Sequence, residues 1–157
     1  MILSFSEIEF KDKILGGIKI HTIRRDSNNR WQVGSKIDFW LGEPEKKYEK
    51  FVPHQFGIGE VSKIEYIILD FRYDEIRNNE VIIGDYNKMK EAIINEECIL
   101  YTPHTLLDTI DELNDFAIKD GFEDWQHLKH FFLLNYGEIV FTGKLIYWEN
   151  FRSIYLY

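Results

Sequence analysis

The chain contains short stretches in which every second residue is apolar, which is the pattern of a β-strand with one buried face. This pattern is clearest over residues 35–41, where Ile37, Phe39 and Leu41 would share one face. Less regular versions, rich in β-branched and aromatic residues, predict four further strands. These strands are expected over residues 2–5, 18–24, 56–71 and 139–149.

A first helix is expected over residues 6–15, between the first two strands. Ser4 and Glu7 have the spacing of a capping box, in which two side chains satisfy the free amides of a helix start. The helix should end at Gly16-Gly17, because glycine readily adopts the backbone conformation that follows a helix.

Two more helices are expected late in the chain. Thr105 resembles a helix start, and the first of these helices should run to Lys119. The second should cover residues 125–136 and end at Gly137. Its apolar residues recur at helical spacing: Trp125, Leu128, Phe132 and Tyr136.

Residues 72–104 have the weakest pattern. Asn78-Asn79 could form the turn of a hairpin between residues 73–76 and 81–83, and a short helix is expected over residues 88–95. The order of all these elements predicts an α+β protein. At 157 residues, the chain has the length of a single domain.

The charge of the chain is acidic and uneven. There are 27 acidic against 19 basic residues, and this excess opposes non-specific binding to nucleic acid phosphates. Residues 1–50 carry 10 basic and 8 acidic residues, whereas residues 60–124 carry 6 and 17. Four cations lie in the first segment: Lys19, Arg24, Arg25 and Arg30. This distribution favours a small anionic or polar ligand, or a short single strand, over a duplex.

The single cysteine, Cys98, excludes an internal disulfide and fits a reducing cytoplasm, which is the expected location. Residues 1–10 lack the pattern of a signal peptide, and no apolar stretch approaches the ~18 residues that cross a bilayer. We therefore expect no membrane partner. The sequence leaves the oligomeric state open.

Residues 17–24 concentrate reactive side chains after a glycine pair. Burial can lower the pKa of a lysine so that it accepts a proton from a neighbouring hydroxyl, which makes a nucleophile of Thr22 beside Lys19. Strict alternation would put Lys19 and Thr22 on opposite faces of a strand, so they can meet only if the strand twists or bulges. The alternative is an edge strand with a solvated lysine and a structural threonine.

This segment resembles the G-x-K-x-x-T-x-R signature of the ASCH family, with Gly17, Lys19, Thr22 and Arg24 at the signature positions. The resemblance continues at 31–37, at Asp120-Gly121-Phe122 and at 141–148. It implies a small, mostly antiparallel, PUA-like β-barrel with flanking helices. It covers roughly residues 1–70 and 105–150, so we interpret 72–104 as an insertion beside the barrel of a single domain, 1–157.

Some members of that family are amidohydrolases that act on N4-acetylcytidine through a lysine, a threonine and a glutamate. The resemblance assigns the first two roles to Lys19 and Thr22, and the carboxylate falls on or next to Asp120. Glu123 is a substitute if the backbone turns it inward. Thr22 would attack the acyl carbonyl, Lys19 would take its proton, and Asp120 would orient the lysine or return a proton.

Five other residues are candidates for ligand contacts. Arg24 could hold a phosphate or a base carbonyl, or instead form an ion pair with the acidic half of the chain. Trp31 could stack on a base or lie in the core. The remaining candidates are His21, Arg30 and Trp148.

His127 and His130 lie three residues apart, but no third ligand has a recognisable spacing, so neither a metal nor another cofactor is expected. The expected partner is a nucleoside, a nucleotide or a short single-stranded RNA, with hydrolysis of an acylated nucleoside as the candidate reaction. The alternatives are a non-catalytic RNA-binding module and a protein-interaction module.

Overall fold

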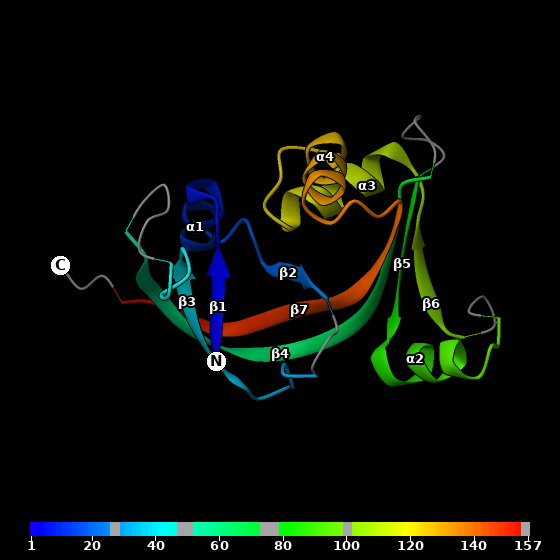
Figure 1. Ribbon diagram of the computed structural model, residues 1–157, viewed down its shortest axis with the longest axis horizontal. Helices are drawn as coiled ribbons and strands as arrows, with labels where there is room; N and C mark the ends of the chain where they lie inside the picture. The colour runs from blue at the N-terminus through cyan, green and yellow to red at the C-terminus, as the bar shows by residue number, and fades with distance from the viewer. Residues whose placement is uncertain (26–28, 47–51, 73–78, 99–101, 155–157) are drawn as a thin grey trace.

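Two long, bent strands form the spine of the computed structural model, which describes residues 1–25, 29–46, 52–72, 79–98 and 102–154 (Figure 1). They are β4 (His54–Asp70) and β7 (Val140–Ser153), and they pair antiparallel along most of their length. The described residues form four helices and one mixed sheet of seven strands, which confirms the α+β class.

Shorter strands extend this spine. β3 (Lys36–Leu41) pairs with the first half of β4, and β1 (Ile2–Phe5) pairs parallel to β3. β5 (Glu80–Asp85) pairs with the second half of β4, and β6 (His104–Leu107) pairs with β5. β2 (His21–Arg24) lies on the other edge of β7. Among the described strands no further pairing joins β1, β2 or β6, so the curved sheet stays open.

The helices lie on different sides of the sheet. α1 (Ile8–Leu15) follows β1, while α3 (Ile110–Lys119) and α4 (Trp125–Tyr136) pack together inside the curve of the sheet (Figure 1). α2 (Tyr86–Ile94) lies apart from these, against β4 and β5. No helix in the described ranges is both long and apolar enough to cross a membrane.

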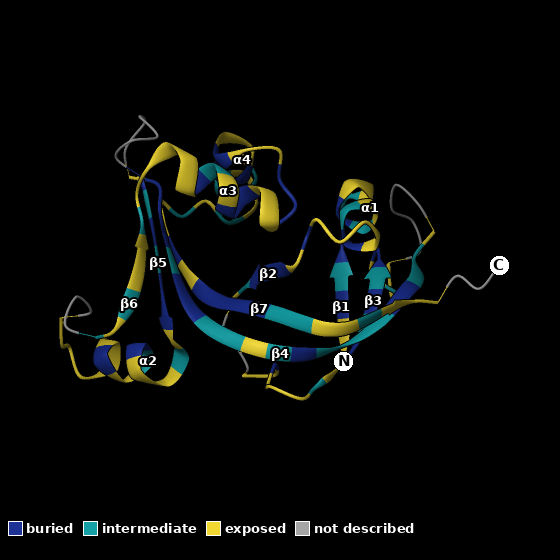
Figure 2. Cartoon of the chain, turned by 180° about the vertical axis from the view of Figure 1, so that it is seen from behind, coloured by how far each residue is buried: buried dark blue, intermediate teal, exposed yellow. Residues whose placement is uncertain are grey.

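The core lies between the inner face of the sheet and the facing sides of α3 and α4, whose outer sides are exposed (Figure 2). Trp125 at the start of α4 is fully buried, and its indole N–H donates to Asn79 at 2.9 Å. At the other end, the ring of Phe39 packs against Phe5, Phe56 and Phe151. At this end, the aromatic packing joins four strands of the sheet, β1, β3, β4 and β7.

Several predicted elements are confirmed. Strands occur at 2–5, 36–41, 54–70 and 140–153, and helices occur at 86–94 and 125–136. Gly137 ends α4 with a left-handed backbone at φ 68°.

The predicted capping box between Ser4 and Glu7 is wrong. Ser4 belongs to β1 and pairs with Trp40 of β3, which holds its backbone in an extended conformation. Glu7 itself is the residue before α1, and no side chain caps that helix. The parallel pairing of β1 therefore overrides a local helix signal.

The predicted helix start at Thr105 is also wrong. Residues 104–107 form β6, where Thr105 pairs with Ile83 of β5. The helix begins at Ile110, after a true capping box between Thr109 and Glu112. This segment pairs with the edge of β5 that β4 leaves free. The local sequence cannot show that such an edge is available.

Residues 72–104 contribute to the sheet. The first arm of the predicted hairpin, 73–76, lies outside the described residues. The second arm, 81–83, lies in β5, which pairs with β4 on one side and β6 on the other. The predicted strand 18–24 is shorter than expected, because only His21–Arg24 is extended and paired.

Candidate functional site

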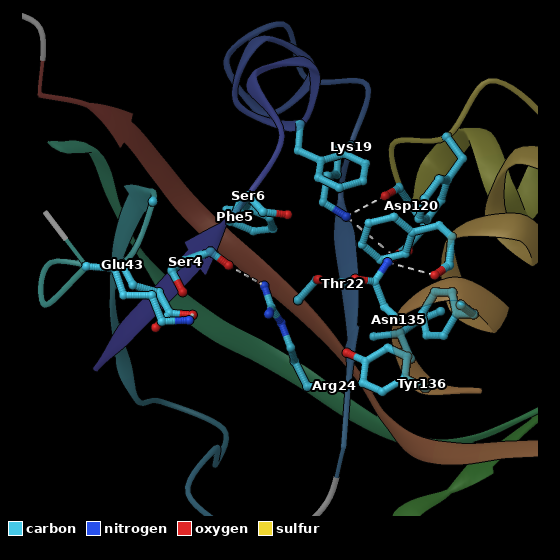
Figure 3. A pocket seen from close by; sticks show the side chains of 17 residues that line it. Ser4, Phe5, Ser6, Lys19, Thr22, Arg24, Glu43, Asp120, Asn135 and Tyr136 are labelled. Atoms are coloured by element: carbon cyan, nitrogen blue, oxygen red, sulfur yellow. Dashed lines mark hydrogen bonds and ion pairs between the residues drawn. The ribbon is translucent and has the colours of Figure 1, made fainter. Parts of the chain in front are cut away.

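A cavity of about 300 Å³ lies between the end of β1, strand β2 and the helix pair α3–α4 (Figure 3). This volume is within the range of small-molecule sites. Its charged lining residues are Lys19, Arg24, Glu43, Lys46 and Asp120. Its aromatic lining consists of Phe5, Phe10, Phe122, Phe131, Phe132 and Tyr136. The cavity thus combines apolar walls with a few convergent charges.

Lys19 is buried in the wall of this cavity, with 2% of its surface exposed. Its Nζ donates to the backbone carbonyl of His21 at 2.9 Å and to that of Asp120. The same nitrogen lies 3.6 Å from Oδ1 of Asp120 and about 5 Å from the ring centre of Phe10. Lys19 is therefore held by two carbonyls, a carboxylate and an aromatic ring.

Burial lowers the pKa of Lys19 to about 8. Asp120 opposes this effect by favouring the ammonium, while the charges of Arg24 and Lys13 add to it. With this pKa, about a tenth of the Lys19 side chains are neutral amines at pH 7. An exposed lysine has almost no neutral amine at that pH, so this site can supply a base.

The turn after α1 directs Lys19 inward. Gly17 has a left-handed backbone at φ 74°, and the amides of Ile18 and Lys19 both donate to the carbonyl of Lys13. Ile18 and Ile20 are 50% and 40% exposed while the lysine between them is buried. Isoleucine is usually buried and lysine usually exposed, so this arrangement is the reverse of the usual one. It lowers the stability of the folded chain, and a turn with only a structural role would not require it.

Thr22 lies in β2, is buried and lines the same cavity. Figure 3 shows its side chain between Lys19 and Arg24. Residues 18–20 lie before the paired strand β2, so the alternation of a strand need not extend to Lys19, and Lys19 and Thr22 line one cavity. Among the described residues, no hydrogen bond joins the Thr22 hydroxyl to Lys19.

Arg24 enters the cavity from the end of β2. Its Nη2 donates to the backbone carbonyl of Ser4 at 2.7 Å, and its guanidinium lies 5.2 Å from the ring centre of Phe5. Its Nε is buried and has no hydrogen-bond partner among the described residues. Burial lowers the pKa of Arg24, but an arginine stays protonated in proteins. Arg24 is thus a fixed, incompletely paired cation at the cavity.

His21 supports the site without lining the cavity. Its ring stacks on Phe116 at 5.1 Å and meets the edge of Tyr147 at 5.3 Å. Its Nδ1 lies 2.9 Å from Oδ1 of Asp120, and both side chains are buried. His21 therefore contacts a predicted site residue rather than the ligand space.

The structure does not bring Arg30, Trp31 or Trp148 to the cavity. Trp31 is buried in the core, and the guanidinium of Arg30 lies 5.9 Å from its ring centre. Trp148 is partly buried and packs edge-on against Phe39. The core alternative therefore holds for Trp31, because its side chain belongs to the main cluster of buried apolar residues.

Glu123 also lies outside the cavity. It is exposed and forms an ion pair with Lys13 at 3.0 Å, so it does not replace Asp120. Sequence reasoning missed Ser6, Glu43 and Asn135, which line the cavity. None of these three stands in a recognisable motif, since only the folded chain brings their segments together.

No group of three or more His, Cys, Asp or Glu side chains in the described ranges could hold a metal ion. Comparisons of the chain with protein-family models, with curated proteins and with solved structures found no match.

Proposed function

We propose that this chain is an ASCH-type domain with a PUA-like fold, whose cavity binds a nucleoside, a nucleotide or a modified base of a short single-stranded RNA. We further propose that it hydrolyses an acylated nucleoside such as N4-acetylcytidine. The observation that carries this proposal is that Lys19, with a pKa of about 8, lines the same cavity as Thr22 and Asp120. In this proposal the domain spans 1–157, contains 72–104 as an insertion and acts in the cytoplasm.

The rest of the cavity lining suits a flat, polar ligand. The rings of Phe10, Phe131 and Tyr136 offer surfaces on which a base can stack. Asn135 offers both donors and acceptors for the edge of a base. Arg24 offers its guanidinium to a phosphate or a base carbonyl.

Lys19 has suitable surroundings for a general base. A neutral amine keeps two N–H donors, and the carbonyls of His21 and Asp120 accept from both. The third position of the amine then carries the lone pair, which in this proposal accepts the proton of the Thr22 hydroxyl. Once Lys19 is protonated, the carboxylate of Asp120 stabilises its charge.

The proposed reaction has two half-reactions. Thr22 Oγ1 bonds to the acyl carbon, and Lys19 takes the hydroxyl proton. The C–N bond then breaks, and Lys19 gives this proton to the departing amine. Water next attacks the acyl ester on Thr22, Lys19 takes a proton from it, and that proton returns to the Thr22 oxygen as the acid leaves.

The test is release of acetate from N4-acetylcytidine by the purified protein. Lys19→Met keeps most of the side-chain volume without the amine, and Thr22→Val keeps the shape without the hydroxyl. Each should lower kcat by at least about 100-fold, because each removes a group that acts in the chemical step. Lys88→Ala and Thr105→Ala are matched controls at exposed positions of α2 and β6, and they should keep full activity.

A second candidate function is binding without turnover. It is favoured by the absence of a hydrogen bond between Lys19 and Thr22, since a lysine satisfied by carbonyls can simply support the cavity. Calorimetry with cytidine and cytidine monophosphate separates the two functions. Saturable binding by folded protein that releases no acetate would replace the hydrolase proposal with this one.

A further inference from the structure

The hydrolysis proposed above makes no use of one buried contact at the edge of the site, the hydrogen bond between His21 and Asp120. Nδ1 of His21 lies 2.9 Å from Oδ1 of Asp120, while Nζ of Lys19 lies 3.6 Å from the same oxygen. A carboxylate can only accept hydrogen bonds, so Nδ1 carries the proton whenever Asp120 is ionised. The histidine is thus the closer of two donors that compete for one oxygen.

The ring of His21 has little freedom to move. It stacks on Phe116 of α3 with 25° between the ring planes, and Tyr147 of β7 meets it edge-on. His21 and Tyr147 are also paired residues of β2 and β7. The position of Nδ1 is therefore set by one helix, α3, and one strand, β7, and it cannot follow Asp120 if that side chain turns.

His21 also contacts Lys19 directly. Its backbone carbonyl accepts a hydrogen bond from Lys19 Nζ at 2.9 Å, while its ring contacts Asp120. One residue of β2 thus holds both members of the Lys19–Asp120 pair.

We propose that His21 is a positioning residue, whose Nδ1–H holds the Asp120 carboxylate back from Lys19 so that the lysine can act as a base. This inference rests on the proposed function. Without the imidazole donor, the buried carboxylate must seek another donor, and the closest one is the ammonium of Lys19.

Such a movement changes the titration of Lys19. A shorter distance to an opposite charge favours the ammonium, so the pKa of Lys19 should rise from about 8 toward that of an ordinary lysine. The other charged groups that act on Lys19 are Arg24 of β2 and Lys13 of α1, and neither is changed by a substitution at His21.

The experiment compares wild-type protein with His21→Leu, which has no donor, and His21→Asn, whose amide can donate from about the position of Nδ1. The pKa of Lys19 is followed by NMR in protein with 13C-labelled lysine, with Lys19→Met assigning the signal. His21→Leu should raise this pKa by at least about one unit. His21→Asn should keep the wild-type value, and His130→Leu is a control at an exposed histidine of α4.

Activity on N4-acetylcytidine gives the second readout. A rise of one unit lowers the neutral fraction of Lys19 about tenfold at pH 7, so His21→Leu should lose about tenfold in kcat with little change in KM. Its pH profile should move up with the pKa, and His21→Asn should restore the wild-type profile.

An unchanged Lys19 pKa in folded His21→Leu would overturn the inference, and so would an equal shift in His21→Asn. If His21→Leu does not fold, 15N NMR of His21 in the wild-type protein tests the inference by showing which ring nitrogen carries the proton. A neutral His21 with its proton on Nε2 would contradict the inference. The lysine titration does not depend on turnover. The Lys19 pKa could follow the expected pattern across wild type, His21→Leu and His21→Asn while the wild-type protein releases no acetate. That result would defeat the proposed function and leave the positioning role of His21 intact.

Discussion

At the scale of single residues, the site is defined by a lysine in an environment that suits an apolar side chain. Lys19 lies among Phe5, Phe10 and backbone carbonyls, and burial accounts for most of its lowered pKa. Burying a lysine in this way reduces stability, and residues with strongly shifted pKa values are found mainly at functional sites. The sequence indicated the importance of Lys19, but its burial became visible only in the folded chain.

The pH dependence of activity follows from this pKa. A general base must be unprotonated, so kcat/KM for N4-acetylcytidine should rise about tenfold per pH unit below pH 8 and level off above about pH 8. Steady-state rates between pH 6 and about 9.5 check this expectation. A rate independent of pH over that range would mean that Lys19 does not act as the base.

At the scale of elements, the site depends on how helices end. α3 ends at Asp120, and Gly121 follows with a left-handed backbone at φ 97°. A Cβ on Gly121 would press against the Lys19 side chain and the ring of Phe10. The turn after α3 therefore presents Asp120 and leaves room for Lys19 at the same time.

Gly121→Ala should destabilise the protein by more than the about 1–2 kcal/mol that a left-handed backbone costs an alanine, because it adds an overlap with Lys19. Gly137→Ala is the matched control, since Gly137 ends α4 at φ 68° with open space around it. Urea unfolding of both variants measures the difference. Equal losses of stability in the two variants would show that Lys19 and Phe10 move enough to accommodate the added methyl group.

At this scale, local sequence pattern predicted some elements correctly, and pairing between distant strands decided others. α4 could be predicted because its apolar residues recur at helical spacing and Gly137 ends it. The predicted capping box at Ser4 and the predicted helix start at Thr105 were wrong, because Ser4 pairs with β3 and Thr105 pairs with β5. Strand pairing between distant segments is a tertiary interaction, and it decided both cases against a local signal.

At the scale of the whole molecule, the bent sheet brings together three segments that are far apart in sequence. The cavity is lined by residues from 4–24, 42–46 and 120–136. The chain as a whole carries a formal charge of −8, while the cavity contributes three basic and two acidic side chains. The cavity lining therefore has one more basic than acidic side chain in a chain that is acidic overall.

This charge distribution predicts selectivity for short ligands. A short single-stranded RNA should bind more tightly than its duplex, because few cations are available to neutralise phosphates along a helix. Its affinity should depend only weakly on salt between about 50 and 200 mM, as expected for one or two phosphate contacts. Fluorescence anisotropy measures both properties. Tighter binding of the duplex with a steep salt dependence would contradict a small-ligand cavity.

The sequence by itself determined the α+β class, most strands and helix α4, since these follow from local periodicity. It placed Lys19, Thr22 and Arg24 on one short segment, but strand alternation alone would have separated Lys19 from Thr22. Only the tertiary structure decided that Asp120 lines the cavity with Lys19, that His21 contacts Asp120 outside the cavity, and that Trp31 and Trp148 lie elsewhere. It also decided the burial of Lys19. The physical reason is that burial and hydrogen-bond partners depend on which distant surfaces pack together, and short-range patterns carry no record of that packing.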